Sequence, residues 1–242
     1  KSITVQDGRL NVVAPGRPVG EARVFRQMSA AITADPTDGV LAQGKLIGRE
    51  GPVTFILAYT AADGARRLVV SADGVSPRDL APLQPVQSGF SLSPQLEARW
   101  RNDGSPQSAS LSMDVGAGIV KFGRDPPREL DRASADISWA AGDPDIAVNA
   151  VRIVAGGSSM SVTGRITPAV DAPWTWTLGT RDAVFDAPDI VGPPVYVTRI
   201  VGSGRMDFAR KLLHVDQVNG AMPSGRSDEG GGVDLKDGGG GG

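Results

Sequence analysis

Residues 134–166 read SADISWAAGDPDIAVNAVRIVAGGSSMSVTGRI and contain the pattern from which the fold can be predicted. Apolar and polar residues alternate over 135–139, 146–150 and 160–166, and the turn formers Gly, Asp and Pro lie between these segments. Side chains two residues apart in a strand point to the same face of a sheet. The stretch therefore predicts three antiparallel strands, each with one apolar and one polar face.

Similar alternation extends on both sides of this stretch and predicts further hairpins. Three hairpins are predicted: strands 3–5 and 10–12 with a turn at Asp7-Gly8, strands 53–59 and 67–70 with a turn at 63–64, and strands 96–100 and 109–115 with a turn at 102–104. Residues 174–178 are predicted to form a further strand. The run 53–59 is continuously apolar, which favours a strand buried on both faces. Ser76 followed by Pro77 supplies an N-cap and a first helical position, which predicts one short helix at 76–80.

Composition supports an all-β fold with at most one or two short helices. The 242 residues include 32 Gly and 18 Pro, which helix interiors resist by about 1 and 3 kcal/mol. The net charge of −2 shows no excess of basic residues, which a nucleic-acid-binding protein would be expected to have. The absence of cysteine excludes disulfides and thiolate metal sites.

The sequence predicts one repetitive β domain over 1–220, either whole or as two stacked sub-units of about 1–115 and 116–220. Gly-rich residues 221–242 contain little apolar material and predict a flexible tail. The acidic residues of this tail do not match the spacing of calcium-binding repeats. No resident metal or cofactor is expected.

A small residue, a glycine, a basic residue and an apolar residue occur in series at three places. They are found within 40–46, 162–166 and 201–206. The recurrence is either chance in a Gly-rich chain or one structural unit used repeatedly, each too small to bury its own apolar face.

Catalytic patterns are weak, and we expect the protein not to be an enzyme. The one histidine, His214, has Asp216 on the same strand face, but no Gly-x-Ser-x-Gly motif occurs. We therefore expect a solvent-facing strand histidine. Most aspartates adjoin Gly or Pro, where they form turns. A third hypothesis is an enzyme whose two catalytic carboxylates are distant in sequence and brought together by the fold.

Several segments resemble the AsmA-like proteins of the bacterial envelope, particularly the YhdP and TamB branch. The resemblance is carried by 134–139, 151–157 and 161–166, and again by 197–208. The opening 3–10 and the stretch 76–83 are similar to the upstream part of that family.

This resemblance implies an elongated, repetitive antiparallel sheet curved into a hydrophobic groove. It also implies a periplasmic, cell-envelope protein that moves phospholipid towards the outer membrane. The inner-membrane anchor would lie in a segment outside this chain. The partners would be phospholipid acyl chains, with no nucleic acid involved and protein partners unknown.

An apolar strand face must be covered by another sheet, a helix or a ligand. The residues expected to line the groove are Phe55, Leu57, Leu111, Met113, Ile137, Trp139, Ile146, Val148, Met160, Val162, Trp174 and Trp176. The alternative is a closed β-sandwich that binds carbohydrate or protein, in which the same tryptophans are core residues or sugar-stacking surfaces. Sequence alone does not separate the residues that face lipid from those that face packed neighbours.

Overall fold

All the secondary structure that is described is β-strand. The computed structural model describes residues 2–12, 23–35, 39–48, 50–62, 64–77, 86–122, 127–186, 192–207 and 212–221. The predicted all-β fold with repeated antiparallel strands is confirmed, and no helix occurs in these ranges. Consequently they contain no helix with the length and apolar character needed to span a membrane.

The chain divides into two compact units, which are described separately. The N-terminal unit comprises residues 1–141 and the C-terminal unit residues 142–242. This division falls further along the chain than the predicted one near 115. The predicted flexible tail at 221–242 lies outside the described residues except for Ala221, the last residue of a strand.

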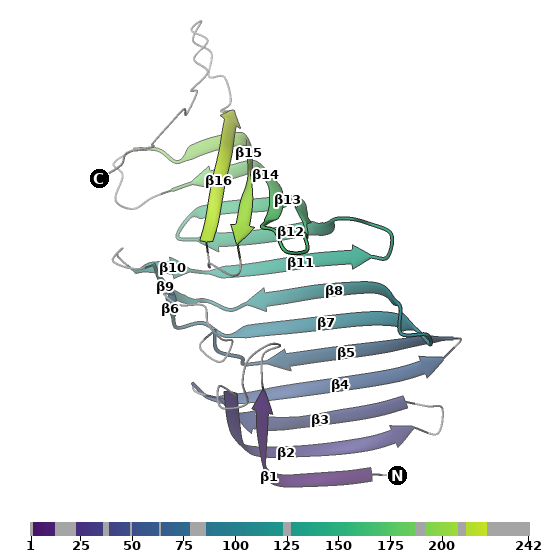
Figure 1. The fold of residues 1–242 in the computed structure, drawn as a ribbon. Coiled ribbons are helices and arrows are strands. Elements are labelled where there is room, and N and C mark those ends of the chain that lie inside the picture. Colours follow the sequence, from purple (N-terminus) through teal and green to yellow (C-terminus); the bar gives the residue numbers. More distant parts are fainter. Residues whose placement is uncertain are drawn as a thin grey trace, which may run out of the picture. The chain divides into compact units, whose positions relative to one another are not determined.

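The N-terminal unit is built on eight strands that lie side by side (Figure 1), each antiparallel to its neighbour. Their order in the sheet is β1 (Ser2–Val12), β2 (Arg23–Asp35), β3 (Gly39–Ile47), β4 (Pro52–Ala62), β5 (Ala65–Asp73), β7 (Leu92–Arg101), β8 (Pro106–Val115) and β11 (Arg132–Ala140). Each strand therefore pairs with the strand before it in this order. A second, three-stranded sheet has the order β10 (Arg128–Leu130), β9 (Gly118–Phe122) and β6 (Val86–Ser88).

The C-terminal unit has five strands in sequence order. They are β12 (Ile146–Ala155), β13 (Ser158–Thr167), β14 (Trp174–Phe185), β15 (Val195–Asp207) and β16 (Leu212–Ala221). The predicted turn between β12 and β13 is confirmed, with positive φ angles of 52° and 90° at Gly156 and Gly157. Two successive positive φ angles are those of the hairpin turn whose twist matches its strands.

The predicted hairpins at 53–70 and 96–115 are confirmed as β4–β5 and β7–β8. The predicted hairpin at Asp7-Gly8 is wrong, because β1 passes through these residues and pairs with β2 on both sides of them. Asp7 adopts a φ of 51°, and the register shifts here, so the two residues form a bulge rather than a turn. Figure 1 shows β1 bending sharply.

Two other local predictions have different outcomes. Residues 53–59 are not buried on both faces, because Ile56 is 47% exposed while Val53 is 5% exposed. A continuous apolar run thus occupies a strand with only one buried face. Most of the helix predicted at 76–80 lies outside the described residues. Ser76 itself is buried, and its hydroxyl donates a hydrogen bond of 2.6 Å to Glu50 Oε2.

The buried core of the N-terminal unit is small and lies towards one end of its strands. Leu46, Val53, Val75 and Leu92 form it. Seven partly buried apolar residues pack against it: Phe25, Met28, Phe55, Ala72, Phe90, Met113 and Val115. No large side chain is completely buried in the described chain. Most of the apolar material therefore lies outside this core.

The three repeated glycines share one structural role. Each lies within a strand, where a backbone carbonyl and a larger side chain of neighbouring strands together occupy the space that a Cβ would need. A Cβ at Gly44 would lie 2.9 Å from Phe55 Cζ, one at Gly164 would lie 3.1 Å from Leu178 Cδ2, and one at Gly204 would lie 2.6 Å from Trp176 Cζ2. These contacts favour a reused structural unit over chance, because all three glycines admit a bulky cross-strand neighbour.

We predict that Gly204→Ala destabilises the protein by about 1–3 kcal/mol, since the added methyl group overpacks the sheet against Trp176 and the carbonyl of His214. Gly192→Ala is the matched control in the same unit, because its Cβ would have no atom within 4 Å. Urea unfolding followed by circular dichroism measures both. Equal midpoints for the two variants would contradict this role for the glycine.

Candidate functional site: an apolar sheet face

Strand register in the N-terminal unit places one apolar residue of every strand in a single row across the sheet. The row is Ile3, Ile32, Ala42, Leu57, Val70, Leu96, Leu111 and Ile137. The neighbouring row on the opposite face is Thr4, Ala31, Gln43, Ile56, Ser71, Gln95, Ser112 and Asp136, which is mostly polar. The sheet therefore has an apolar face and a polar face.

The middle of this apolar face is not closed by other described parts of the unit. Leu96 is 41% exposed and Ile3 is 63% exposed, although both belong to the apolar row. Leu57, Leu111 and Ile137 are half-buried. Only the end of the face at the Leu46–Leu92 core is sealed. We call the row and its same-face neighbours from β1 to β11 the N-terminal apolar face.

All six groove residues predicted in this unit lie on the N-terminal apolar face, but they have different surroundings. Phe55 and Met113 pack against the buried core, so their neighbours are protein side chains. Leu57, Leu111 and Ile137 belong to the half-exposed row, and Trp139 lies one pair further along, opposite Ala109. The structure thus separates packed from accessible candidates, which periodicity alone did not do.

The C-terminal unit repeats the arrangement on a smaller scale. Its predicted residues Ile146, Val148, Met160, Val162, Trp174 and Trp176 share one face by register. Val148 is only 5% exposed, so it is a packed residue. A bulge between Val148 and Val151 then shifts the alternation, so that Val151 rather than Ala150 pairs with Val162 on this face.

Trp176 covers the glycines of the next strand. Its ring atoms would lie 3.3 Å from a Cβ at Gly202 and 2.6 Å from one at Gly204. Its Nε1 and the hydroxyl of Thr180, on the same face, are both buried without a hydrogen-bond partner. This part of the face is occupied by the protein's own aromatic side chain.

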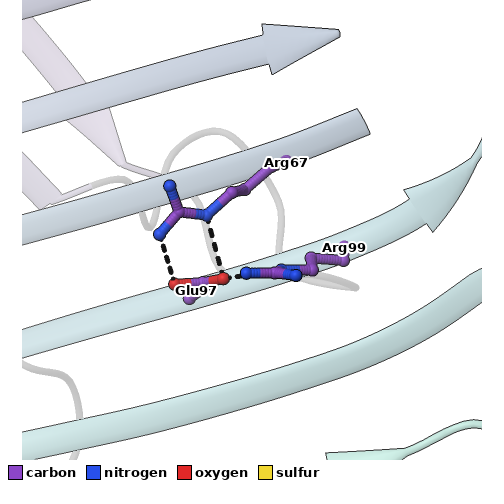
Figure 2. Close-up of polar contacts among 3 residues, drawn as sticks. All are labelled: Arg67, Glu97 and Arg99. Carbon is purple, nitrogen blue, oxygen red and sulfur yellow. Dashed lines mark hydrogen bonds and ion pairs between the residues drawn. The ribbon is translucent and has the colours of Figure 1, made fainter. Parts of the chain in front are cut away.

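The polar face of the N-terminal unit has an ionic cluster that joins neighbouring strands. Figure 2 shows Glu97 between two guanidinium groups. Arg67 Nε and Nη2 donate to Glu97 Oε1 and Oε2 at 2.9 and 2.7 Å, and Arg99 Nε donates to Oε1 at 2.7 Å. Arg67 and Arg99 are directly opposed in the register, and Glu97 offsets their repulsion.

These hydrogen bonds, first from Arg67 and then from Arg99, lower the pKa of Glu97 from 4.5 to about 2. The same contact raises the pKa of Arg67. The cluster is solvated, so it contributes no more to stability than an ordinary surface ion pair. It marks the polar face as a solvent-facing surface.

The remaining chemical candidate from the sequence is the histidine of the C-terminal unit. His214 is exposed on β16, as predicted. Asp216, which the sequence pattern places on the same strand face as His214, accepts a hydrogen bond of 2.9 Å from Arg205 Nη2. No group of three His, Asp or Glu residues suited to holding a metal ion is found in the described part of the chain.

Comparison with known proteins yields no match to a family model, a curated protein or a solved structure. The resemblance to AsmA-like proteins therefore stays a prediction from sequence.

Sequence reasoning missed two features of the apolar face. Val70 and Leu96 complete the row across the middle of the sheet, and the alternation at 96–100 was sufficient to include Leu96. Arg66 also lies on this face, because it pairs with Ala61 on one side and Trp100 on the other. Its position could not be assigned from its own segment, since it depends on the register with β7.

We predict that Arg67→Gln raises the pKa of Glu97 from about 2 towards the ordinary range, because the larger of its two hydrogen-bonded contacts is lost. Carboxyl carbon shifts in an NMR pH titration measure this. Since the folded pKa lies below the ordinary value of 4.5, the stabilisation is complete above that pH and is lost as pH falls towards 2.

The control for this titration is Arg132→Gln. Arg132 also lies on the polar face, on β11, and it is exposed. Its replacement should leave the titration of Glu97 unchanged. An unshifted Glu97 in the Arg67 variant would show that the ion pair does not persist in solution.

Proposed function

We propose that the N-terminal apolar face binds lipid acyl chains and that the protein is a non-enzymatic segment of a lipid transport protein of the bacterial envelope. In this proposal the parent protein crosses the periplasm, is anchored to the inner membrane by a segment outside this chain, and shields phospholipid on its way to the outer membrane. One observation carries the proposal: eight strands contribute apolar residues to one row, which remains half-exposed.

The dimensions of the face fit acyl chains. Seven steps between strands of about 4.8 Å give the row a length of roughly 34 Å. The hydrocarbon core of a bilayer is about 30 Å thick, so one acyl chain reaches across about half of that distance. Acyl chains that lie across the row, parallel to the strands, can therefore be bound side by side along its length.

The binding energy would come from hydrophobic contact rather than from specific hydrogen bonds. Each CH₂ group removed from water contributes about 0.8 kcal/mol, and a chain resting on one surface gains a fraction of this for each group. Because this attraction has no direction, a bound chain can move along the row. Such a surface is better suited to passing lipid along than to holding one molecule in a pocket.

The competing function is a closed β-sandwich that binds carbohydrate or protein. Its basis is the sealed end of the apolar face, where Val75, Phe90 and Leu92 pack as in an ordinary core. This packing covers one end only, whereas Leu96 in the middle of the row remains 41% exposed. The balance favours the lipid-binding proposal.

We predict that the protein purified from bacterial cells carries phospholipid and that Leu96→Asp reduces the bound amount about tenfold. A carboxylate in contact with acyl chains must be desolvated, which costs several kcal/mol unless the lipid is displaced. Native mass spectrometry measures the lipid carried by each variant, and circular dichroism checks that each variant folds.

Leu41→Asp is the matched control. Leu41 is 42% exposed and pairs with Ala58 on the polar face, so it differs from Leu96 chiefly in the side of the sheet that it occupies. It should retain lipid at the unmodified level. A lipid-free protein, or equal loss from both variants, would count against the proposal.

A further inference from the structure

Arg66 is the one charged residue that the strand register places on the apolar face from β3 to β11 of the N-terminal unit. It pairs with Ala61 of β4 and Trp100 of β7, whereas Arg67 points to the polar face and binds Glu97. The next pair inward from Arg66 is Leu68 with Ala98. A single cation thus adjoins an otherwise apolar surface.

No described residue neutralises this cation. Arg66 is half-buried, and no hydrogen bond or ion pair joins it to another residue in the part of the chain that the structure describes. Asp103 lies in the turn that follows β7, but its carboxylate accepts hydrogen bonds from Ser105. A guanidinium beside an apolar surface is therefore left with its hydrogen-bonding capacity unused by these residues.

Aromatic side chains accompany Arg66 at this end of the face. The rings of Tyr59 and Trp100 lie with centroids 6.3 Å apart and tilted by 37°. Tyr59 pairs with Leu68, two residues from Arg66 on the same face. Tyrosine, tryptophan and arginine combine an apolar body with a polar tip, which is the character of side chains at a boundary between hydrocarbon and headgroups.

The opposite end of the same strands is sealed. Ala72 lies on the same strand and face as Arg66 and packs against the Leu46–Leu92 core. Arg66 and Ala72 are six residues apart along β5, which corresponds to about 20 Å. This length holds one acyl chain, whose reach is about half of a 30 Å bilayer core. The face thus has a cationic, aromatic end and a closed, apolar end.

We propose that Arg66 binds the phosphate group of a phospholipid whose acyl chains extend from Tyr59 and Trp100 towards the sealed core. This inference rests on the proposed lipid-binding function and adds to it the headgroup chemistry and the orientation of the ligand. The planar guanidinium can donate two parallel hydrogen bonds to phosphate oxygens, and it gains most from them where water is partly excluded.

The test uses the full chain after incubation with vesicles of phosphatidylglycerol, or of phosphatidylglycerol containing diacylglycerol with the same acyl chains. Protein is separated from vesicles by flotation, and native mass spectrometry measures both lipids. We expect Arg66→Gln to lower uptake of phosphatidylglycerol about tenfold and to leave diacylglycerol uptake unchanged, because diacylglycerol has no phosphate. Arg66→Lys should take up an amount of phosphatidylglycerol between those of the unmodified protein and Arg66→Gln, because lysine keeps the charge.

Arg132→Gln, which removes a cation from the polar face, should leave the uptake of both lipids unchanged. If Arg66→Gln takes up as much phosphatidylglycerol as the unmodified protein while Leu96→Asp takes up less, the proposed phosphate site at Arg66 is wrong. The proposal that the N-terminal apolar face binds lipid is then retained. Uptake of neither lipid by the unmodified protein overturns both proposals. Displacement of bound phosphatidylglycerol by millimolar inorganic phosphate would indicate a site for free anions and also overturn the inference.

Discussion

Register between antiparallel strands is the constraint on which the described N-terminal unit depends. Side chains alternate between faces with a period of two, so a slip of one residue moves a strand's apolar residues to the solvent side. From Ile3 on β1 to Ile137 on β11, the pairs keep apolar residues together through eight strands. This shared register, rather than a large buried core, gives the sheet two chemically different faces.

Much of the strand pattern could be predicted from sequence because alternation is a local signal. Ala135, Ile137 and Trp139 lie on one face as their spacing indicates. The predictions that were wrong concern features that depend on pairing between strands. The bulge at Asp7 resembles a hairpin turn in sequence, because Asp-Gly favours both a turn and a positive φ, and only pairing with β2 on both sides distinguishes them. The bulge after Val148 is likewise undetectable from composition.

The candidate site was predictable as a face but not as a set of distinct environments. All the proposed residues of the N-terminal unit share that face, yet Phe55 meets the core while Leu57 remains half-exposed. The difference arises because Phe25 of β2 and Phe90, which are distant in sequence, pack at one end only. The position of Arg66 on this face could not be predicted for a similar reason, since its neighbour Trp100 belongs to another hairpin.

A surface sealed at one end has a direction, which an evenly exposed sheet lacks. At the sealed end, apolar contacts are already satisfied by protein, so a ligand gains nothing by displacing them. In the middle, Leu96 and its row still expose apolar area and gain from any apolar cover. At the far end, burial of Arg66 without a partner would be costly, so a purely apolar cover is disfavoured there. A ligand that satisfies all three regions must be apolar along most of its length and anionic at one end.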